Sequence, residues 1–511
     1  LPLRLALGPN AWDTAVYLDA IQRIRMGQVP SLDFFAPVGP LGYYGAALLD
    51  ALFPRAQPML LANWALLPVL LPVAGLLCGH VATRSRPMAF ALLLPFLLFA
   101  SLPINLHSLY PMPGVALLLY LLIAALLFVR DRRLTTGLVA ALMLTLFLVK
   151  ITGAVTGTLL VGYAVFAGRL RLRDATMAAA LVLGALGVLD LATGLVRAYI
   201  ADILALLALN TGALLPRFLT VASVKFNVVG PCLLLLGVLA LAAWREGIVP
   251  SVKGLRTLAD SPMGWLAAAL VALTFFETQN TGSLEYIGLW PILLLVLLDW
   301  SGRQDRLKPL VLVLALATAL PSAVIFVERS VRAVLGMTGH VALAAPEIGP
   351  LGRVSLKADM AARAAGMLEH YATQQASYRE LARRDLPPSY ILYSEIDYQA
   401  TWLLEVRQGV SAIRAWEAAN GRTLNGFLTL DFVDPFNRLL DRTPPRHVPI
   451  GMDPGRSTPA IAPETLAELA GTDAILAPKC PPTTARDTIL QHFEQAISGR
   501  KRVALSPCWD M

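Results

Sequence analysis

Residues 10 to 49 read NAWDTAVYLDAIQRIRMGQVPSLDFFAPVGPLGYYGAALL, with three aspartates, Asp13, Asp19 and Asp33, ahead of a Pro-Leu-Gly-Tyr-Tyr segment. The 511-residue chain around them is 56% hydrophobic and 15% charged, and its mean hydropathy is +0.63. These values are too apolar for a common soluble domain and indicate a polytopic membrane protein. What the acidic stretch can contact therefore depends on the side of the bilayer that it faces.

Apolar runs of roughly membrane-spanning length, some of them short, fill the chain up to residue 327. Ten are found, at about 58–80, 87–104, 111–129, 134–150, 152–168, 175–196, 226–244, 262–277, 286–300 and 308–327. Residues 40–54 are apolar but too short to span, and are expected to form a helix that dips into the outer leaflet. The opening LPLRLALGPN resembles the end of something longer, so an initial transmembrane helix is expected before it.

Basic residues in the short loops predict the orientation. Alternate loops carry fourteen of them and are assigned to the cytoplasm, while the intervening loops hold only four, which are Lys150, Arg197, Arg217 and Lys225. This alternation places residues 1–57 and everything after about residue 328 outside. It also explains the formal charge of +8 without a nucleic-acid partner.

The predicted fold is an all-α polytopic membrane core of about 10 to 12 transmembrane helices with a C-terminal extracytoplasmic α/β domain. The expected divisions are a first extracytoplasmic loop with interfacial helices, the helical core and the soluble domain, at 1–57, 58–327 and 328–511. Residues 197–225 are read as an interfacial helix plus loop on the outer face.

Within the soluble domain, the pattern predicts two helices and two short strands, at 357–384 and 483–498, and at SYILYSEID and DAILAP. Cys480 and Cys508 could form a disulfide there, although their spacing alone leaves this open. The segment LDFVDPFNRLLDRTPPRH, residues 430–447, gathers several charges that could contact a glycan, but a solvated turn and helix is the favoured interpretation.

Asp13 is the first candidate for chemistry, because an outward carboxylate near the membrane can take a proton from an attacking hydroxyl or hold a divalent metal. It could also cap the helix expected to end at Gly27, as could Asn10. Asp19 is expected to form a surface pair with Arg23 at i, i+4 spacing. Asp33 is either a second site carboxylate or a loop anchor, and both alternatives stay open.

The outward Asp13, with Tyr17 four residues on, the helix ending at Gly27 and the segment SLDFFAPVGPLGYY, resembles the first outer loop of the GT-C glycosyltransferases. The likeness covers residues 10–330 in architecture but only about 10–45 in motif. It implies a membrane enzyme that uses polyprenyl-phosphate-linked sugars, with Asp13 in the place of the acidic residue. The chain lacks the paired acidic residues of some members, so no cofactor is assigned and a divalent metal is left open.

The resemblance implies a hexosyl or pentosyl transfer to a lipid, glycan or protein acceptor, at the outer face of an inner membrane with the C-terminal domain in the periplasm. Positive charge near the leaving phosphate is expected from the four outer basic residues, of which Lys150 is the sharpest case. Further substrate-binding candidates on the outer side are Tyr43, Tyr44, His107 and Glu277.

Bland alternatives exist for most of these residues: Lys150 could snorkel, Tyr43 and Tyr44 could be interfacial anchors, and His107 could be merely polar. The alternative functions are a transporter or flippase of lipid-linked glycans, a polymerase or ligase, and a non-catalytic scaffold. The spans carry few internal charges and no repeat is visible, which favours the enzyme over the transporter.

Overall fold

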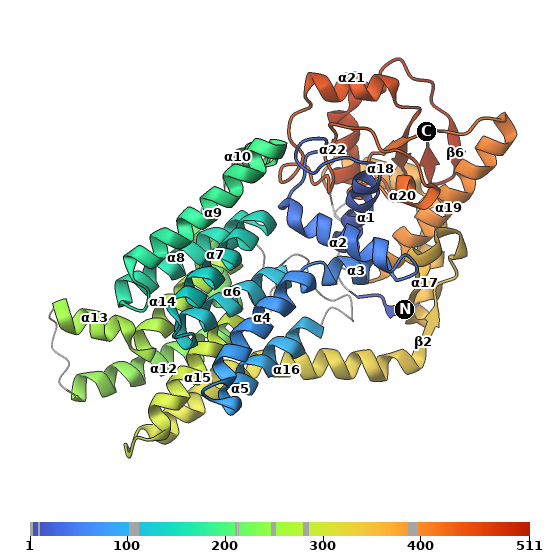
Figure 1. Cartoon of the computed structure of the whole chain (residues 1–511). Helices are drawn as coiled ribbons and strands as arrows, with labels where there is room; N and C mark the ends of the chain where they lie inside the picture. The colour runs from blue at the N-terminus through green and yellow to red at the C-terminus, as the bar shows by residue number, and fades with distance from the viewer. Residues whose placement is uncertain are drawn as a thin grey trace.

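The computed structural model describes residues 4–8, 11–101, 112–209, 212, 214–246, 252–278, 286–386 and 396–511. A bundle of apolar helices occupies one end of the molecule and a smaller mixed domain the other, with α1, α2 and α3 between them (Figure 1). This is the predicted all-α core with a C-terminal α/β domain.

In the described part of the chain each predicted apolar run forms a helix, except that residues 58–80 form two, Pro58–Trp64 and Leu67–Ala82. The bundle helices are α4 (Leu67–Ala82), α5 (Arg86–Ser101), α6 (Met112–Phe128), α7 (Arg132–Val149), α8 (Ile151–Ala167), α9 (Leu172–Thr193), α12 (Phe226–Arg245), α13 (Val252–Asp260), α14 (Pro262–Glu277), α15 (Trp290–Ser301, after the 3-10 turn η2, Ile287–Leu289) and α16 (Lys308–Gly336). Side chains of α6 are buried on all sides, whereas only 11% of the apolar window of α9 is buried. The two helices therefore occupy the centre and the lipid-facing edge of the bundle.

Length and composition show which helices can cross a bilayer. In the described part of the chain five are long and apolar enough, or seven if each of two bent pairs counts as one span, and four more apolar helices are shorter. The protein is thus of the multi-pass membrane type. Residue 328 is not a structural boundary, because α16 continues unbroken to Gly336.

The N-terminal segment forms β1 (Leu5–Ala6), α1 (Ala11–Arg25), α2 (Pro40–Leu52) and α3 (Pro58–Trp64). Pro40 occupies the first turn of α2, where its missing N–H costs nothing. As expected for a helix that dips into a leaflet, α2 is too short to span, and it exposes Leu48, Leu52 and the following Phe53.

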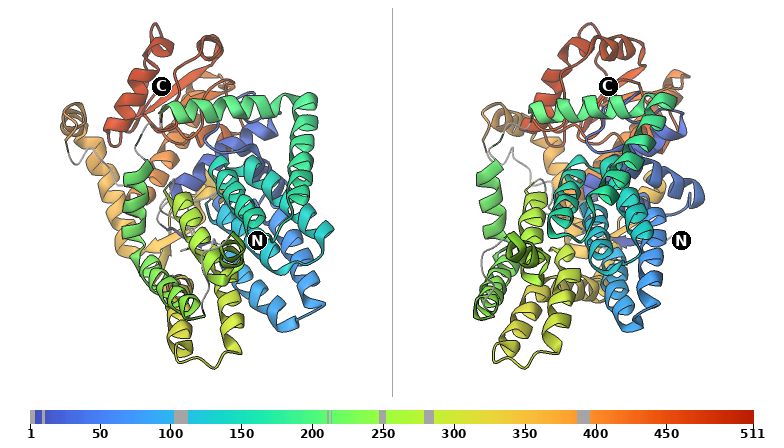
Figure 2. Two further views of the ribbon diagram at one scale, coloured as in Figure 1. Left: turned by 90° about the vertical axis from the view of Figure 1, so that its left-hand side faces the viewer. Right: turned by 60° about the vertical axis from the view of Figure 1, so that its left-hand side comes forward.

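Residues 195–224 form two helices, α10 (Leu195–Leu209) and α11 (Leu214–Val224), bent by 85° from each other. The sequence predicted one helix plus a loop, so the second helix was missed. Figure 2 shows α10 turning away from the end of α9 and lying across the bundle beside the C-terminal domain.

The C-terminal domain has two small sheets. In the first, β3 (Val354–Lys357) pairs in parallel with β1 and antiparallel with β2 (His340–Ala342). The second has the order β4-β5-β7-β6, formed by Phe427–Thr429, Ala474–Pro478, Trp509–Asp510 and Ala504–Ser506. Strand β5 is the predicted DAILAP strand, while most of SYILYSEID lies outside the described residues and its last two residues begin α19.

Helices cover these sheets and include both predicted helical regions. They are α17 (Ala358–Thr373), α18 (Gln375–Arg383), α19 (Ile396–Asn420), α20 (Phe436–Leu440), α21 (Pro463–Gly471), α22 (Thr484–His492) and α23 (Glu494–Ile497), with the 3-10 segment η3 (Met337–Gly339) and η4 (Pro346–Gly352). The long helix α19 is buried along most of its length and packs against α17 and η4. Because β1 belongs to the same sheet as β3, the N-terminal segment is part of this domain's structure.

Candidate functional site

Helix α1 begins against the C-terminal domain. Trp12 is buried, its backbone N–H donates to Oε1 of Gln399 at 3.0 Å, and its ring lies 5.0 Å from the ring of Phe432. Asp13 is the next residue, the third of α1, so it is not the N-cap. Its side chain and Asn10 lie outside the described part of the structure. Asp13 therefore keeps its role as a prediction, with its backbone fixed at this contact.

The loop between α1 and α2, residues 29–39, is held to the C-terminal domain through Asp33. The Asp33 carboxylate accepts the N–H of Val29 at 2.7 Å and pairs with Arg446 at 2.9 Å, and its backbone oxygen accepts the N–H of His447. Phe35 also accepts a backbone hydrogen bond, from Ile450. Both carboxylate oxygens of Asp33 are thus engaged by protein groups, as a loop anchor requires.

The same loop is seated on the turn between α7 and α8. Gly39 donates its N–H to the carbonyl oxygen of Val149 at 2.8 Å. The next residue, Lys150, ends α7 and begins α8, and its side chain is half-buried. The 29–39 loop therefore connects the surroundings of two predicted site residues. Asp33 lies within the loop, and Lys150 directly follows the residue that Gly39 contacts.

Helix α10 completes the surroundings of the 29–39 loop. Asp202 is 8% exposed and its carboxylate lies beside Ser31 and receives the backbone N–H of Ala36. Tyr199, one turn earlier, is buried, approaches Gly39 and Ile151 with its hydroxyl, and has its ring 5.6 Å from that of Phe147. The sequence did not single out Asp202 as a candidate, although an acidic residue within an apolar run is itself a signal of a site.

The two tyrosines that open α2 have different surroundings. Tyr43 is buried and its ring lies 4.8 Å from that of Tyr17 on α1, so it is a packing residue between the two helices. Tyr44 is 37% exposed and faces Asp33. Burial, together with the negative charge of Asp33, raises the pKa of Tyr44. Of the pair, Tyr44 is the one positioned to meet a ligand.

The remaining predicted residues are dispersed. Arg197 is largely exposed and pairs with Asp190 across the α9–α10 bend at 3.6 Å, and Arg217 is exposed on α11 beside Gly212. Lys225 is buried just before α12. Glu277 is buried at the end of α14. His107 lies outside the described residues.

Asp19 and Arg23 form the predicted i, i+4 pair at 2.8 Å, but the prediction of a surface pair was wrong. Their side chains are only 4% and 1% exposed. The reason is that the polar side of α1 lies against the C-terminal domain, where Arg23 also donates to the carbonyl oxygen of Pro445 at 2.6 Å. Burial raises the pKa of Asp19 despite the adjacent guanidinium.

The first part of the charged segment 430–447 is likewise not solvated. Asp431 and Asp434 are buried, and Arg438 makes two 2.8 Å hydrogen bonds to Asp50 of α2. Asp434 accepts from Thr429, and its pKa is raised to about 7 by burial and by Asp19. The interpretation as a solvated turn and helix is therefore wrong for the first part of the segment, which packs against α1 and α2, whereas Asp441 and His447 near its end are exposed.

A second buried charge group lies directly behind this interface. Arg486 binds Asp431 at 2.7 Å and Glu405 at 2.9 Å, so one cation faces two carboxylates. Burial, only partly offset by Arg486, raises the pKa of Glu405 to about 7, and the repulsion from Asp431 adds to this. Asp19, Arg23, Asp431 and Asp434 also line a cavity of about 10 Å³, which has room for about one water.

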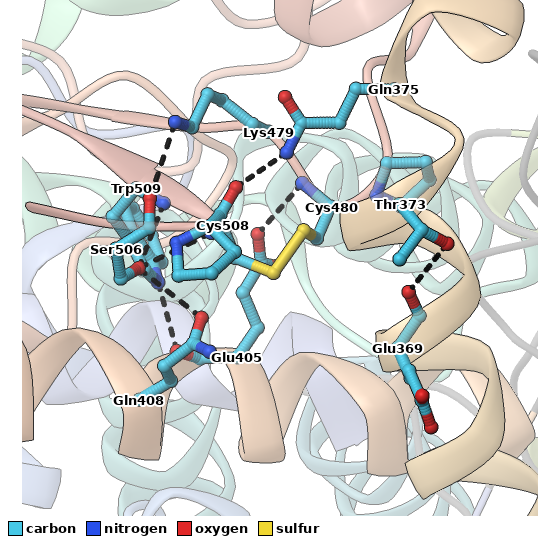
Figure 3. The surroundings of a disulfide bond; sticks show 12 residues. Glu369, Thr373, Gln375, Glu405, Gln408, Lys479, Cys480, Ser506, Cys508 and Trp509 are labelled. Atoms are coloured by element: carbon cyan, nitrogen blue, oxygen red, sulfur yellow. Dashed lines mark hydrogen bonds between the residues drawn. A yellow bond between two sulfur atoms is a disulfide. The ribbon is translucent and has the colours of Figure 1, made fainter. Parts of the chain in front are cut away.

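Cys480 and Cys508 form a disulfide in the C-terminal domain, a pairing that their spacing in the sequence had left open. Figure 3 shows the bond between α19 and the last strands, with Glu405 accepting the N–H of Cys480 at 3.2 Å. The carboxylate of Glu405 thus contacts both the disulfide-bonded Cys480 and Arg486 of the buried charge group. In the described part of the chain, no cluster of three His, Cys, Asp or Glu side chains has metal-binding geometry.

Comparison with known proteins gives few matches. No family model and no curated protein matches the chain. Two solved structures do, both of ArnT from Cupriavidus metallidurans, one in the apo state and one bound to undecaprenyl phosphate. Each is 14% identical, with TM-scores of 0.41 and 0.42, and they cover 99% and 100% of this chain and 94% of their own. At these values the likeness does not establish the function of this chain.

Proposed function

We propose that this protein is a GT-C-type glycosyltransferase that moves a hexosyl or pentosyl group from a polyprenyl-phosphate donor to a lipid, glycan or protein acceptor. The observation that carries the proposal is the hydrogen bond from Gly39 to Val149. This bond holds the outer loop that contains Asp33 against the α7–α8 turn. The turn carries Lys150, the strongest candidate for phosphate binding among the basic residues at this end of the bundle. A carboxylate for the hydroxyl and a cation for the phosphate are the two groups that this reaction needs.

In the proposed reaction, the acceptor hydroxyl oxygen attacks the anomeric carbon of the donor sugar. The bond from that carbon to the phosphate oxygen breaks, the hydroxyl proton passes to a carboxylate, and polyprenyl phosphate leaves. Asp13 is the proposed base, because the Asp33 carboxylate is already occupied by Val29 and Arg446. Lys150 would neutralise the charge that develops on the phosphate, with Tyr44 at the rim as a hydrogen-bond donor.

The proposed location is the inner membrane, with the C-terminal domain in the periplasm. The Cys480–Cys508 disulfide supports it, because disulfides persist in oxidising compartments. The interface of the C-terminal domain with α1 and α2 supports the same side of the membrane for the proposed base, Asp13.

The test is sugar transfer by the purified full chain, reconstituted with radiolabelled polyprenyl-phosphate sugars. We expect release of polyprenyl phosphate, its loss in Asp13→Asn, and a raised donor KM in Lys150→Met. The Arg132→Met variant serves as the control, since Arg132 is half-exposed, is paired with Asp174 and is not a candidate site residue. Assays with and without EDTA decide whether a divalent metal takes part. If no donor and acceptor pair supports transfer, the proposal is wrong.

A further inference from the structure

The side chain of Asp202 poses a problem that the proposed reaction does not explain. It lies on α10, a largely apolar helix, and 92% of its surface is buried, since 8% is exposed. Its Oδ2 atom and the Ser31 hydroxyl are both buried, and neither makes a hydrogen bond of normal geometry within the described residues. Burial of a carboxylate that lacks part of its hydrogen bonds is destabilising, so its presence on α10 calls for an explanation.

Two groups of the 29–39 loop lie at the Asp202 carboxylate. Ser31 lies beside its carboxylate and Ala36 donates its backbone N–H to it. These two residues flank Asp33, two positions before it and three after it. The loop also contains a strained backbone position, since Ser31 has φ of 66°, a region that costs non-glycine residues energy. Such a conformation persists only where its surroundings hold it.

Tyr199 extends the same contact to the other end of the loop. It is one helical turn before Asp202, and its hydroxyl lies 2.9 Å from the position of a Cβ on Gly39. It also receives a hydrogen bond from the backbone of Ile151, the residue after Lys150. One face of α10 therefore touches the loop on both sides of Asp33 and the turn that holds Lys150.

We propose that Asp202 is a positioning residue that holds the 29–39 loop against α10 and so fixes the distance between the first-loop carboxylates and Lys150. It acts through Ala36 and Ser31 and not on the substrate, because its carboxylate is enclosed. This role rests on the proposed function for its catalytic consequence, whereas the holding of the loop stands independently of it. Loss of Asp202 removes this contact, while those at Gly39 and at the C-terminal domain remain.

The experiment compares Asp202→Ala, Asp202→Asn and Leu204→Ala in the full chain, with hydrogen–deuterium exchange of residues 29–39 as the first measurement. Leu204 is the control because it is on the same helix and 61% exposed. We expect exchange in this loop to accelerate about tenfold or more in Asp202→Ala. Asp202→Asn keeps an oxygen for the N–H of Ala36, so its exchange should match that of the wild type, as should the exchange of Leu204→Ala.

Transfer assays on the same variants give the second measurement. Displacement of the loop in Asp202→Ala should lower kcat by about 100-fold with a smaller change in acceptor KM, and Asp202→Asn should restore kcat to within about threefold. Unchanged exchange in Asp202→Ala would overturn the proposal. So would an inactive Asp202→Asn with a protected loop, because the charge itself would then matter. If the wild type transfers no sugar, the exchange result still decides the holding role, and only the proposed function is lost.

Discussion

The backbone of Gly39 lies against the α7–α8 turn so closely that no side chain fits. Its N–H donates to Val149, and a Cβ built on it would lie 2.2 Å from the carbonyl oxygen of Leu148. Gly39 has φ of −67° and ψ of 157°, which any residue adopts, so the glycine is required by space and not by conformation. The Pro-Val-Gly-Pro sequence is therefore the point at which the first loop is fixed to the bundle.

Gly39→Ala should consequently separate the loop from the bundle. Because the opposing atoms are backbone, they cannot move aside, and we expect a loss of about 1–3 kcal/mol in the free energy of unfolding. Thermal melting in detergent measures it. Gly137→Ala in α7 is the matched control, since open space surrounds its Cβ position and alanine favours a helix. Equal melting of Gly39→Ala and the wild type would contradict the close approach.

Substitutions of Asp13 on α1 and of Asp33 in the 29–39 loop should differ in their effect on sugar transfer. Asp13→Asn should reduce kcat by about 10²–10⁴-fold, the range for loss of a general base. Asp33→Asn should keep most of the activity, because Asp33 anchors the loop through Val29 and Arg446. Steady-state kinetics of both variants provides the measurement. The reverse order would assign the base to Asp33.

Arg446→Ala should cost little, because this partner of Asp33 is 51% exposed and such pairs contribute about 0–1 kcal/mol. The backbone hydrogen bonds from His447 and Ile450 to the loop stay in place. Melting of Arg446→Ala beside the wild type is the measurement. A decrease much larger than this would mean that the ion pair, and not the backbone contact, holds the loop.

Stability should fall as the pH rises toward neutral. The pKa of Glu405 is raised to about 7 in the folded protein from an ordinary value of 4.5, so between these values the folded state binds the proton more tightly than the unfolded one. The free energy of unfolding therefore decreases as pH rises through this window and levels off above about 7. Melting temperatures at pH 5, 6, 7 and 8 should show this trend.

Glu405→Gln should reduce the dependence of the melting temperature on pH, because it removes the carboxyl group that titrates in this window. Arg486 remains paired with Asp431. Glu369→Gln is the control, because Glu369 is exposed on α17. An unaltered pH profile in Glu405→Gln would place the titrating proton elsewhere, with Asp434 as the next group to replace.

The disulfide should be detectable by mass spectrometry of the alkylated protein. Denaturing alkylation without reductant should modify Cys78 and Cys232 alone, and all four cysteines after reduction. Cys480→Ser/Cys508→Ser should lose about 3 kcal/mol of stability, because the bond joins residues 28 apart in sequence. Cys78→Ala provides a comparison within the bundle. Four modified cysteines before reduction would contradict the proposed oxidising compartment.

Hydrophobic runs were enough to predict most of the bundle helices and α2, because these depend on local patterns of apolar side chains. Helix α13 was not predicted, because it lies between two apolar runs. The burial of Asp19, Arg23 and Asp434 could not be predicted in this way. It arises where α1 meets residues 429–452, more than 400 positions along the chain, and no local pattern records such a contact. The same holds for Asp202, whose partners are on the 29–39 loop.

The pairing of β1 with β3 has a consequence for synthesis of the protein. Leu5 and Ala6 find their sheet partners only after residues 354 and 355 have been made. At ordinary elongation rates of about 5–20 residues per second, this is a wait of roughly 20–70 seconds. Throughout that interval the bundle helices can enter the membrane while α1 has no partner domain. A chain stalled before residue 354 would therefore contain the described membrane helices while its N-terminal segment still lacked the domain on which it packs.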